Sequence, residues 1–459
     1  MSVNKQEQAT GPAVDKPVGQ AVGPSAGQTV GLPVDQSVDQ PVDQPVDQPV
    51  DQPVVRASAL RLVLASPLYR GATVALFLSG LGMSAAAPQI ALFLVNDLGG
   101  SLTAAGLFYL TSLTAPVAGY LVGARSDRVG RRLGLFRLCA VAGFLGWAGI
   151  GLSTQLWMPY VISAVVLGFA GAATSQLFAA IHDQGTAHPN ASSDGVVAAV
   201  RMALTAGWVI GPAAGSLLAS QTSPRTVFLA TAACALAQII PLGTLRTPAT
   251  PAAAGHTPQS PAQRPGTRAM LPLLAFTALY VLVYAGEPIK YAYLPIYMNE
   301  QLGFPSGLSG AIIGIQPLVE IILMPVAVVV ARRTGLMRLM AVGAALGVAA
   351  NICFAVTGTA TGLFVGQILM GGVWGIFAAL GIIVAQRLLP TAVATASAIF
   401  LSSTALASAL GGVAGGVGSA VIGLPHIFLI PAVLGSLAVA GLVSMSRSSR
   451  DSALADFTG

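Results

Sequence analysis

Long apolar runs recur along the chain between about residues 71 and 446, separated by short stretches rich in glycine, proline or charge. The approximate bounds of the twelve runs are 71–95, 103–123, 133–153, 157–182, 195–219, 226–245, 270–297, 306–331, 338–358, 360–386, 392–418 and 424–446. Each is long enough to cross the roughly 30 Å hydrocarbon core of a bilayer, which takes a helix of about 20 residues. The pattern predicts an all-α polytopic membrane protein with twelve transmembrane helices.

The segments between the apolar runs divide the chain into five parts. Residues 1–58 contain a Val-Asp-Gln-Pro repeat, and proline at every fourth position excludes a helix, so we predict a disordered arm. Residues 59–245 and 270–446 form the predicted N-terminal and C-terminal six-helix bundles. A linker over residues 246–269 joins them, and residues 447–459 form a tail.

Composition supports a membrane protein and excludes several other classes. Only 8% of the residues are charged, whereas soluble domains average about 25%. The net charge of +6 does not indicate nucleic-acid binding, because the basic residues are scattered over loops without interleaved aromatic residues. The three cysteines lie in apolar runs without metal or redox spacing, so we expect neither a metal site nor a cofactor.

The basic residues give an orientation. Segment 123–132 carries four arginines and one aspartate between two apolar runs, so it must lie in a loop at a membrane face. Lysine and arginine accumulate in cytoplasmic loops, and this assignment leaves only Arg225 in the external loops. We therefore predict a multi-pass protein of the cell membrane with both termini in the cytoplasm.

The two predicted bundles show signs of duplication. Segment 331–335 follows the second run of the C-terminal half and is an altered copy of loop 123–132, with Arg332 where the first copy has Asp127. Two halves of six spans joined by a linker are typical of secondary transporters, whose substrate lies between the halves near the midplane.

The loop signature itself resembles that of the major facilitator superfamily, between the second and third spans. The matching residues are Gly123, Asp127, Arg128, Gly130, Arg131 and Arg132. This resemblance implies a gating role, in which Asp127 caps a facing helix, expected to be span eleven. Arg128 and Asp183 would complete a charge network that latches the cytoplasmic gate.

A second motif lies in span five. Gly207, Gly211, Pro212 and Gly215 resemble the Gly-x-x-x-Gly-Pro-x-x-Gly motif associated with exporters and proton antiporters. The alternative is a plain glycine and alanine face on which two helices pack.

A narrower resemblance is to the sugar efflux transporters of that superfamily. It rests on Ala87-Pro88-Gln89 in span one, Gly106-Leu107-Phe108-Tyr109 in span two, Ser175-Gln176-Leu177-Phe178-Ala179 in span four and Leu318-Val319-Glu320-Ile321 in span eight. It implies a secondary exporter of sugars or sugar-like solutes, driven by a proton gradient. The alternative is a multidrug or amphiphile antiporter of the same superfamily.

Ionisable residues inside spans are candidates for transport, because placing them there costs free energy. Glu320 lies slightly past the middle of span eight, without another charge within four residues. Glu287 and Lys290 share one face of span seven, beside Pro288, and either form part of a site in an interrupted helix or only neutralise each other. Arg201, near the inner end of span five, either snorkels to the cytoplasm or pairs inside the bundle.

Polar and aromatic residues in the spans are the remaining candidates for contacting a sugar. We single out Gln89, Gln176, Asn351 and Trp374, although each is also explained by helix packing. The chain lacks a nucleophile–base pattern and a phosphate-binding glycine loop, so we do not expect an enzyme. We expect the lipid bilayer and a small solute as its partners, and a monomer as its oligomeric state.

Overall fold

The computed structural model describes residues 59–187, 193–245 and 267–458. The predicted arm over residues 1–58 and most of the predicted linker over residues 246–269 lie outside the described residues. Within the described ranges the chain is entirely helical and contains twelve spans that are long and apolar enough to cross a membrane. The predicted all-α architecture with twelve transmembrane helices is confirmed.

The first six spans follow a short helix, α1 (Ala59–Ala65). Their elements are α2 (Pro67–Leu92) with the π-helical turn η1 (Phe93–Asp97); α3 (Leu102–Leu107), η2 (Phe108–Thr114) and α4 (Ala115–Val129); α5 (Arg132–Gly151); α6 (Trp157–Ile162), η3 (Ser163–Leu167) and α7 (Gly168–Ala187); α8 (Ser193–Gln221); and α9 (Pro224–Ala237) with η4 (Ile240–Leu242). The sixth span therefore loses α-helical geometry at Ala237, eight residues before the end of its apolar run.

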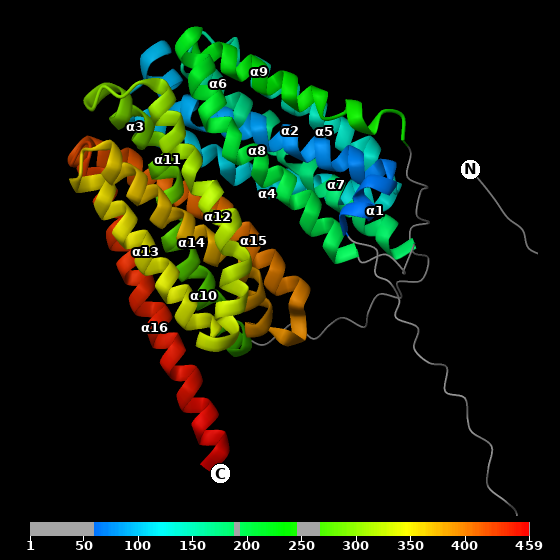
Figure 1. Ribbon diagram of the computed structural model, residues 1–459, viewed down its shortest axis with the longest axis vertical. Coiled ribbons are helices and arrows are strands. Elements are labelled where there is room, and N and C mark those ends of the chain that lie inside the picture. The colour runs from blue at the N-terminus through cyan, green and yellow to red at the C-terminus, as the bar shows by residue number, and fades with distance from the viewer. Residues whose placement is uncertain (1–58, 188–192, 246–266, 459) are drawn as a thin grey trace, which may run out of the picture. The chain divides into compact units, whose positions relative to one another are not determined.

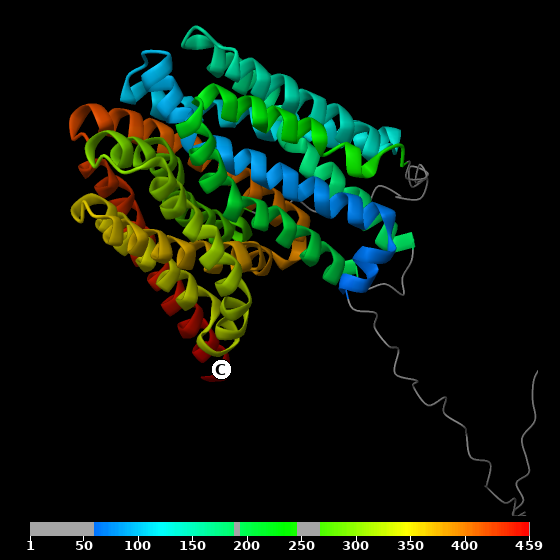
Figure 2. The ribbon, with the colours of Figure 1, turned by 45° about the horizontal axis from the view of Figure 1, so that its top comes forward.

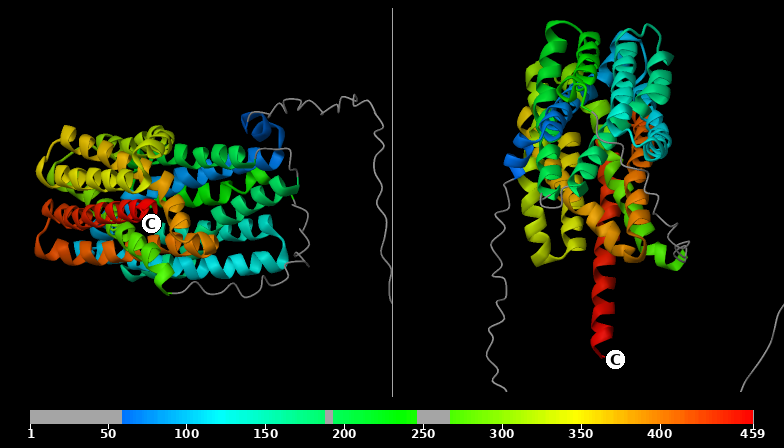
Figure 3. Two further views of the ribbon diagram at one scale, coloured as in Figure 1. Left: turned by 90° about the horizontal axis from the view of Figure 1, so that it is seen from below. Right: turned by 90° about the vertical axis from the view of Figure 1, so that its right-hand side faces the viewer.

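Most of the last six spans are formed by one long helix each. Their elements are α10 (Thr267–Tyr284), α11 (Gly286–Ile296) and η5 (Tyr297–Gln301); α12 (Ser306–Thr334); α13 (Leu336–Val356); α14 (Ala360–Leu388) with η6 (Pro390–Ala392); α15 (Val393–Val421); and η7 (His426–Phe428) with α16 (Leu429–Thr458). Helix α16 continues through residues 447–458, which we had assigned to a tail, and its last turns extend beyond the neighbouring helices (Figure 3).

The seventh span is interrupted at its centre, where the sequence suggested an interrupted helix. Helix α10 ends at Tyr284 and α11 begins at Gly286, with Ala285 between them. Proline has no backbone N–H and cannot continue the hydrogen-bond ladder, so Pro288 is tolerated only because it lies in the first turn of α11. The break places Glu287 at the start of a new helix.

The two faces of the helical bundle differ in how closely the halves approach. Segments 123–132 and 331–335, predicted as loops, lie mostly in the last turns of α4 and α12. We call the face that carries them the basic face, and the opposite face the distal face. Helix α12 packs on α8, and α15 packs on α3 and η2. The helices of the two halves converge at their distal ends and diverge toward the basic face (Figures 1 and 2). The structure is thus closed at the distal face.

Individual contacts between the halves confirm the distal closure. The Tyr293 hydroxyl donates a hydrogen bond of 3.0 Å to the Leu102 carbonyl, and the Ser112 hydroxyl donates one of 3.3 Å to the Ala405 carbonyl. A Cβ atom on Gly412 would lie 2.6 Å from the Gly106 carbonyl oxygen, so the glycine permits the backbones to touch. The contacts of Tyr293 and Gly412 lie in the distal parts of spans two, seven and eleven, and the Ser112–Ala405 contact lies near the middle of spans two and eleven.

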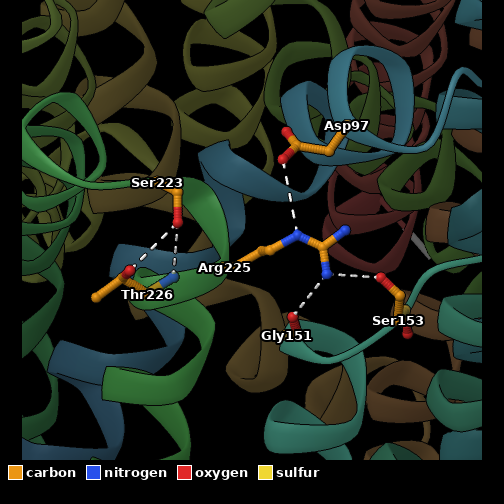
Figure 4. Close-up of polar contacts among 6 residues, drawn as sticks. All are labelled: Asp97, Gly151, Ser153, Ser223, Arg225 and Thr226. Carbon is orange, nitrogen blue, oxygen red and sulfur yellow. Dashed lines mark hydrogen bonds and ion pairs between the residues drawn. The ribbon is translucent and has the colours of Figure 1, made fainter.

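Arg225 ties together the distal ends of three spans in the N-terminal half (Figure 4). Its guanidinium donates to the carbonyl oxygens of Gly151 and Ser153 at 3.2 and 2.8 Å, and its Nε lies 3.9 Å from an Asp97 carboxylate oxygen. The hydroxyl of Ser223 accepts from the Thr226 N–H and caps α9. These contacts stabilise carbonyl groups at helix ends that would otherwise lack a donor.

Candidate functional site

A cavity of about 530 Å³ lies between the two halves, on the basic side of the distal closure. It is walled by α8 on one side and by α10, α11, α12 and α14 on the other. Its lining residues are Arg201, Met202, Leu204, Thr205, Trp208, Tyr284, Glu287, Tyr291, Gln316, Pro317, Glu320, Ile321, Met324, Pro325 and Trp374. The volume is within the range of small-molecule sites, so we call this space the central cavity.

A buried ion pair forms one wall of the central cavity. The Lys290 ammonium lies 2.8 Å from each of the two carboxylate oxygens of Glu287, and the Lys290 side chain is only 1% exposed. The two residues are three positions apart on α11, which brings them onto one helix face. Removing two charges from water costs several kcal/mol per ion, and only close pairing with additional hydrogen bonds offsets that cost.

Two further side chains complete the hydrogen bonding of this ion pair. The indole Nε1 of Trp374 donates to Glu287 Oε1 at 2.5 Å, and Lys290 donates to Gln316 Oε1. Trp374 comes from α14 and Gln316 from α12, so the cluster joins three spans of the C-terminal half. We call these four residues, Glu287, Lys290, Gln316 and Trp374, the polar cluster.

Glu320 lies one helical turn beyond Gln316 on α12 and lines the same cavity. Its carboxylate makes no hydrogen bond or ion pair with the described residues, in contrast to the paired carboxylate of Glu287. Arg201 faces it from α8 as another lining residue and is exposed at the cavity mouth. The cavity thus contains one paired and one unpaired carboxylate.

Aromatic rings surround the polar cluster. The ring centroids of Trp208 and Tyr291 are 6.4 Å apart across the interface between the halves, and those of Tyr284 and Trp374 are 5.1 Å apart. The Lys290 ammonium lies 4.4 Å from the centroid of the Tyr291 ring, which is a cation–π distance. A solute in the cavity would meet flat apolar faces beside a few fixed polar groups.

Three predicted contact residues lie elsewhere. Gln89 lines a different cavity at the distal face, Gln176 accepts a hydrogen bond of 2.5 Å from the Ser126 hydroxyl, and Asn351 donates to the Gly347 carbonyl at 2.8 Å within its own helix. None of them lines the central cavity. For Gln176 and Asn351, the geometry is that of helix packing.

The loop signature forms a network within the N-terminal half. Arg132 pairs with Asp183 at 3.1 Å and also donates to the Ser126 hydroxyl at 2.8 Å. Asp183, which we expect to join a charge network with Arg128, is brought to Arg132 because Arg132 begins α5 beside the basic end of α7. The side chain of Asp127 lies outside the described part of the structure.

The remaining loop residues shape the turn between α4 and α5. Gly130 terminates α4 with φ of 64°, a left-handed conformation that other residues adopt at a cost. Arg131 is the residue before α5, and Gly123 lies within α4 with open space where a Cβ would be. The Ser126–Arg132 bond connects the two helices across this turn.

The three glycines of the exporter-like motif face α2 rather than the central cavity. A Cβ on Gly207 would lie 2.5 Å from the Phe77 carbonyl oxygen, and one on Gly215 would lie 2.6 Å from that of Ala85. Gly211 meets the Leu81 carbonyl in the same way, and the Ser84 hydroxyl donates to the Gly207 carbonyl at 3.1 Å. The motif allows spans one and five to pack with their backbones in contact, and Pro212 lies on the opposite side, against Gly310 of α12.

Sequence reasoning did not single out the lining residues Gln316 and Tyr284. Gln316 could have been found, because it is four positions from Glu320 and lies on the same helix face. Tyr284 had no such signal, since its position depends on the break at Ala285. Among the described residues, no group of three or more His, Cys, Asp or Glu side chains could hold a metal ion.

Comparison with known proteins places the chain in context. A family model described as Major Facilitator Superfamily matches residues 72–363. The "Putative sugar efflux transporter" of Deinococcus radiodurans is 28% identical over 378 residues, covering 81% of this chain and 96% of that protein. "Sugar efflux transporter A" of Dickeya chrysanthemi is 26% identical over 349 residues, covering 74% and 86%.

Solved structures show the same architecture. The nucleoside transporter NupG superimposes with a TM-score of 0.68 at 16% identity, covering 83% of this chain and 98% of that one. A D-xylose–proton symporter gives a TM-score of 0.66 at 16% identity, covering 82% and 96%. At these identities, the similarity concerns the fold.

Proposed function

Because the chain belongs to the Major Facilitator Superfamily, and is therefore a membrane transporter, we propose that it exports sugars or sugar-like neutral solutes in exchange for protons. The observation that carries the proposal is the central cavity, in which the polar cluster and the unpaired Glu320 lie together between the halves. The names of the relatives from Deinococcus radiodurans and Dickeya chrysanthemi support sugar as the substrate class.

The orientation follows from the charge distribution. Lysine and arginine favour the cytoplasmic side, so the basic face is the inner face in this proposal. The described structure is then an inward-open state of a protein in the cell membrane, with both ends of the chain in the cytoplasm. A solute enters the central cavity from the cytoplasm and leaves after the halves rock to close the basic face and open the distal face.

The polar cluster and the aromatic rings suit a sugar. A pyranose offers hydroxyl groups for Glu287 and Gln316, and apolar C–H faces that pack on Trp208 and Tyr291. The Lys290 ammonium holds the Glu287 carboxylate in place, so this carboxylate is positioned to accept hydrogen bonds from the hydroxyls of a bound sugar.

Glu320 is the proton carrier in this proposal. It has no partner among the described residues that would hold it in one protonation state, and it lines the same cavity as the polar cluster. Protonated from outside in the outward-open state, it releases the proton to the cytoplasm when the cavity opens inward. The deprotonated cavity then accepts the solute, which gives exchange in one site.

A second candidate, export of amphiphilic cations, is favoured by a specific feature of the cavity. Its wall includes Met202, Ile321 and Met324 beside the unpaired Glu320. Flexible methionine side chains adapt to varied apolar ligands, and a free carboxylate would attract a cation.

Everted membrane vesicles with an acidic interior distinguish the candidates. We expect accumulation of labelled maltose that a protonophore abolishes, and no gradient-driven accumulation of a cationic dye. Glu320→Gln should abolish sugar accumulation, whereas Glu300→Gln, which changes an exposed acid in η5, should not. Dye accumulation without sugar accumulation would favour the second candidate.

A further inference from the structure

A second cavity of about 310 Å³ lies at the distal face, between the two halves. Spans one, five, seven and eight contribute its polar lining residues, which include Gln89, Asn96, Ser216, Asn299, Ser306 and Ser309. We call this space the distal cavity. None of its lining residues lines the central cavity.

A helix contact separates the two cavities. Where α8 and α12 cross, a Cβ on Gly310 would lie 2.8 Å from the Ala213 Cα, and one on Gly314 would lie 3.0 Å from the Val209 carbonyl oxygen. On α12, the seven residues from Ser309 in the distal cavity to Gln316 in the central cavity span about 10 Å at 1.5 Å per residue. The distance is comparable with the size of one sugar unit plus its contacts.

The lining chemistry of the distal cavity differs from that of the central cavity. Amides and hydroxyls predominate, and no aromatic residue lines it. The Ser309 hydroxyl is buried in a residue that is 3% exposed, and it has no hydrogen-bond partner among the described residues. Gln89, which is 4% exposed, makes only a long bond within the described ranges, of 3.4 Å from its Nε2 to the Ser216 hydroxyl.

These groups have unused capacity to bind a ligand. A buried polar atom without a partner destabilises the protein, so such groups are normally satisfied by protein, water or ligand. Each amide and hydroxyl can both donate and accept, which matches a molecule that presents hydroxyl groups on several sides.

We propose that the distal cavity is a second binding station for a neutral polyhydroxylated solute, occupied on the external side of the α8–α12 contact. The inference rests on the proposed function for its choice of solute, but its observations come from a separate part of the molecule. The solute would pass from the central cavity to this station as the halves rock, and leave from there.

We expect the distal cavity to prefer neutral solutes to anionic ones. Asp97 is the only ionisable residue among its lining residues, and its one described cationic partner, Arg225, lies 3.9 Å away. A second negative charge in the cavity is therefore repelled, because like charges at short range disfavour each other. Glucose should bind better than glucuronate, which has the same ring and an added carboxylate.

Protection of an introduced thiol tests the station directly. In a background with Cys139, Cys234 and Cys353 replaced by alanine, Asn299→Cys places a thiol in the cavity lining, and Gln301→Cys places one outside it on the same turn. A membrane-impermeant maleimide is applied from the distal face of intact cells. At a glucose concentration ten times its Kd, labelling at position 299 should slow about tenfold because only the free site reacts, with position 301 unaffected.

A variant with a blocked central cavity shows whether glucose protects position 299 by binding in the distal cavity or only as a result of transport. Thr205→Trp fills the central cavity from α8 without changing its charges, and should abolish transport. If glucose still protects position 299 in this variant, the station exists on its own. If protection is lost with Thr205→Trp while the parent transports glucose, the station is overturned and the proposed function stands.

The other outcomes are also distinct. Protection by glucose in a parent that transports no sugar supports the station and overturns the proposed function. Equal protection by glucose and glucuronate contradicts the assigned chemistry. Ser309→Ala should weaken protection, whereas Ser436→Ala, whose hydroxyl bonds to the carbonyl of Ala432 in its own helix, should not.

Discussion

The two halves of the molecule share a six-span plan but hold their charged groups in different places. In the C-terminal half, Glu287 and Lys290 are buried near the middle of span seven and Glu320 lines the cavity. In the N-terminal half, the described ion pairs lie at the two ends: Arg132 with Asp183 at the basic end, with both side chains a fifth to a quarter exposed, and Arg225 with Asp97 at the distal end. One half carries the chemistry of the cavity, and the other carries a network at its basic end.

The difference shows how duplicated halves specialise. The altered loop 331–335 of the C-terminal half ends α12 with exposed Arg332 and Arg333, and Arg332 stands where the first copy has Asp127. The second copy therefore lacks the acid of the first. The break at the centre of span seven places a polar site in the C-terminal half, whereas α2, in the equivalent span one of the N-terminal half, is continuous through its centre.

The largest effect should follow from breaking the buried ion pair. Lys290→Met leaves the Glu287 carboxylate buried without its cation, which costs about 3–5 kcal/mol of unfolding free energy. Thermal unfolding of the detergent-purified protein would report the loss. The double variant Glu287→Gln with Lys290→Met should recover most of the stability, and failure to recover it would show that Lys290 acts through packing alone.

Glu320→Gln removes a carboxylate that has no hydrogen bond or ion pair among the described residues, in contrast to the paired Glu287. Gradient-driven sugar transport should fall at least about tenfold, equivalent to about 1.4 kcal/mol, while sugar–sugar counterflow continues. Counterflow in proteoliposomes, measured beside gradient-driven uptake, separates the two. Equal loss of both activities would assign Glu320 to substrate binding rather than proton transfer.

Contact between the halves can be perturbed at a single glycine. Gly310→Val adds a side chain where even a Cβ would lie 2.8 Å from the Ala213 Cα. Such overpacking costs about 1–3 kcal/mol of stability. The population should shift from the distally closed state toward the distally open state. Spin-label distances between Gln221→Cys and Gln301→Cys should lengthen, whereas Gly307→Val, which meets nothing within 4 Å, should leave them unchanged.

The smallest effect is expected for the basic-face network. Arg132→Gln removes a partly exposed ion pair, and such pairs contribute about 0.2–1 kcal/mol. Arg332→Gln in the C-terminal copy should change the unfolding free energy even less, because Arg332 is exposed in the last turn of α12. A larger loss from Arg332→Gln than from Arg132→Gln would reverse the assigned asymmetry.

The spans were predictable from the sequence because lipid imposes a direct requirement. A segment with no water to hydrogen-bond its backbone must be helical and apolar for about 20 residues, and that requirement is visible in single runs. The pairing of Glu287 with Lys290 was equally local, since three residues on one helix bring side chains together.

The rest depended on how distant helices meet. Gln89 and Trp374 are both polar or aromatic residues within a span. Gln89 lines the distal cavity, whereas Trp374 donates a hydrogen bond to Glu287. Nothing in their own helices distinguishes them, because the partner comes from another span. The glycines of span five likewise fit any close helix contact, and only the structure identifies α2 as their neighbour.

The exchange of a proton for a sugar through one cavity is tested most directly by reversing the driving force. Purified protein is placed in proteoliposomes without a pH gradient, and an outward or inward gradient of maltose is imposed while a trapped pH dye reports proton movement. We expect the sugar gradient to drive protons in the opposite direction, and Glu320→Gln to move sugar without protons. Sugar movement with no proton movement in the unmodified protein would contradict the account.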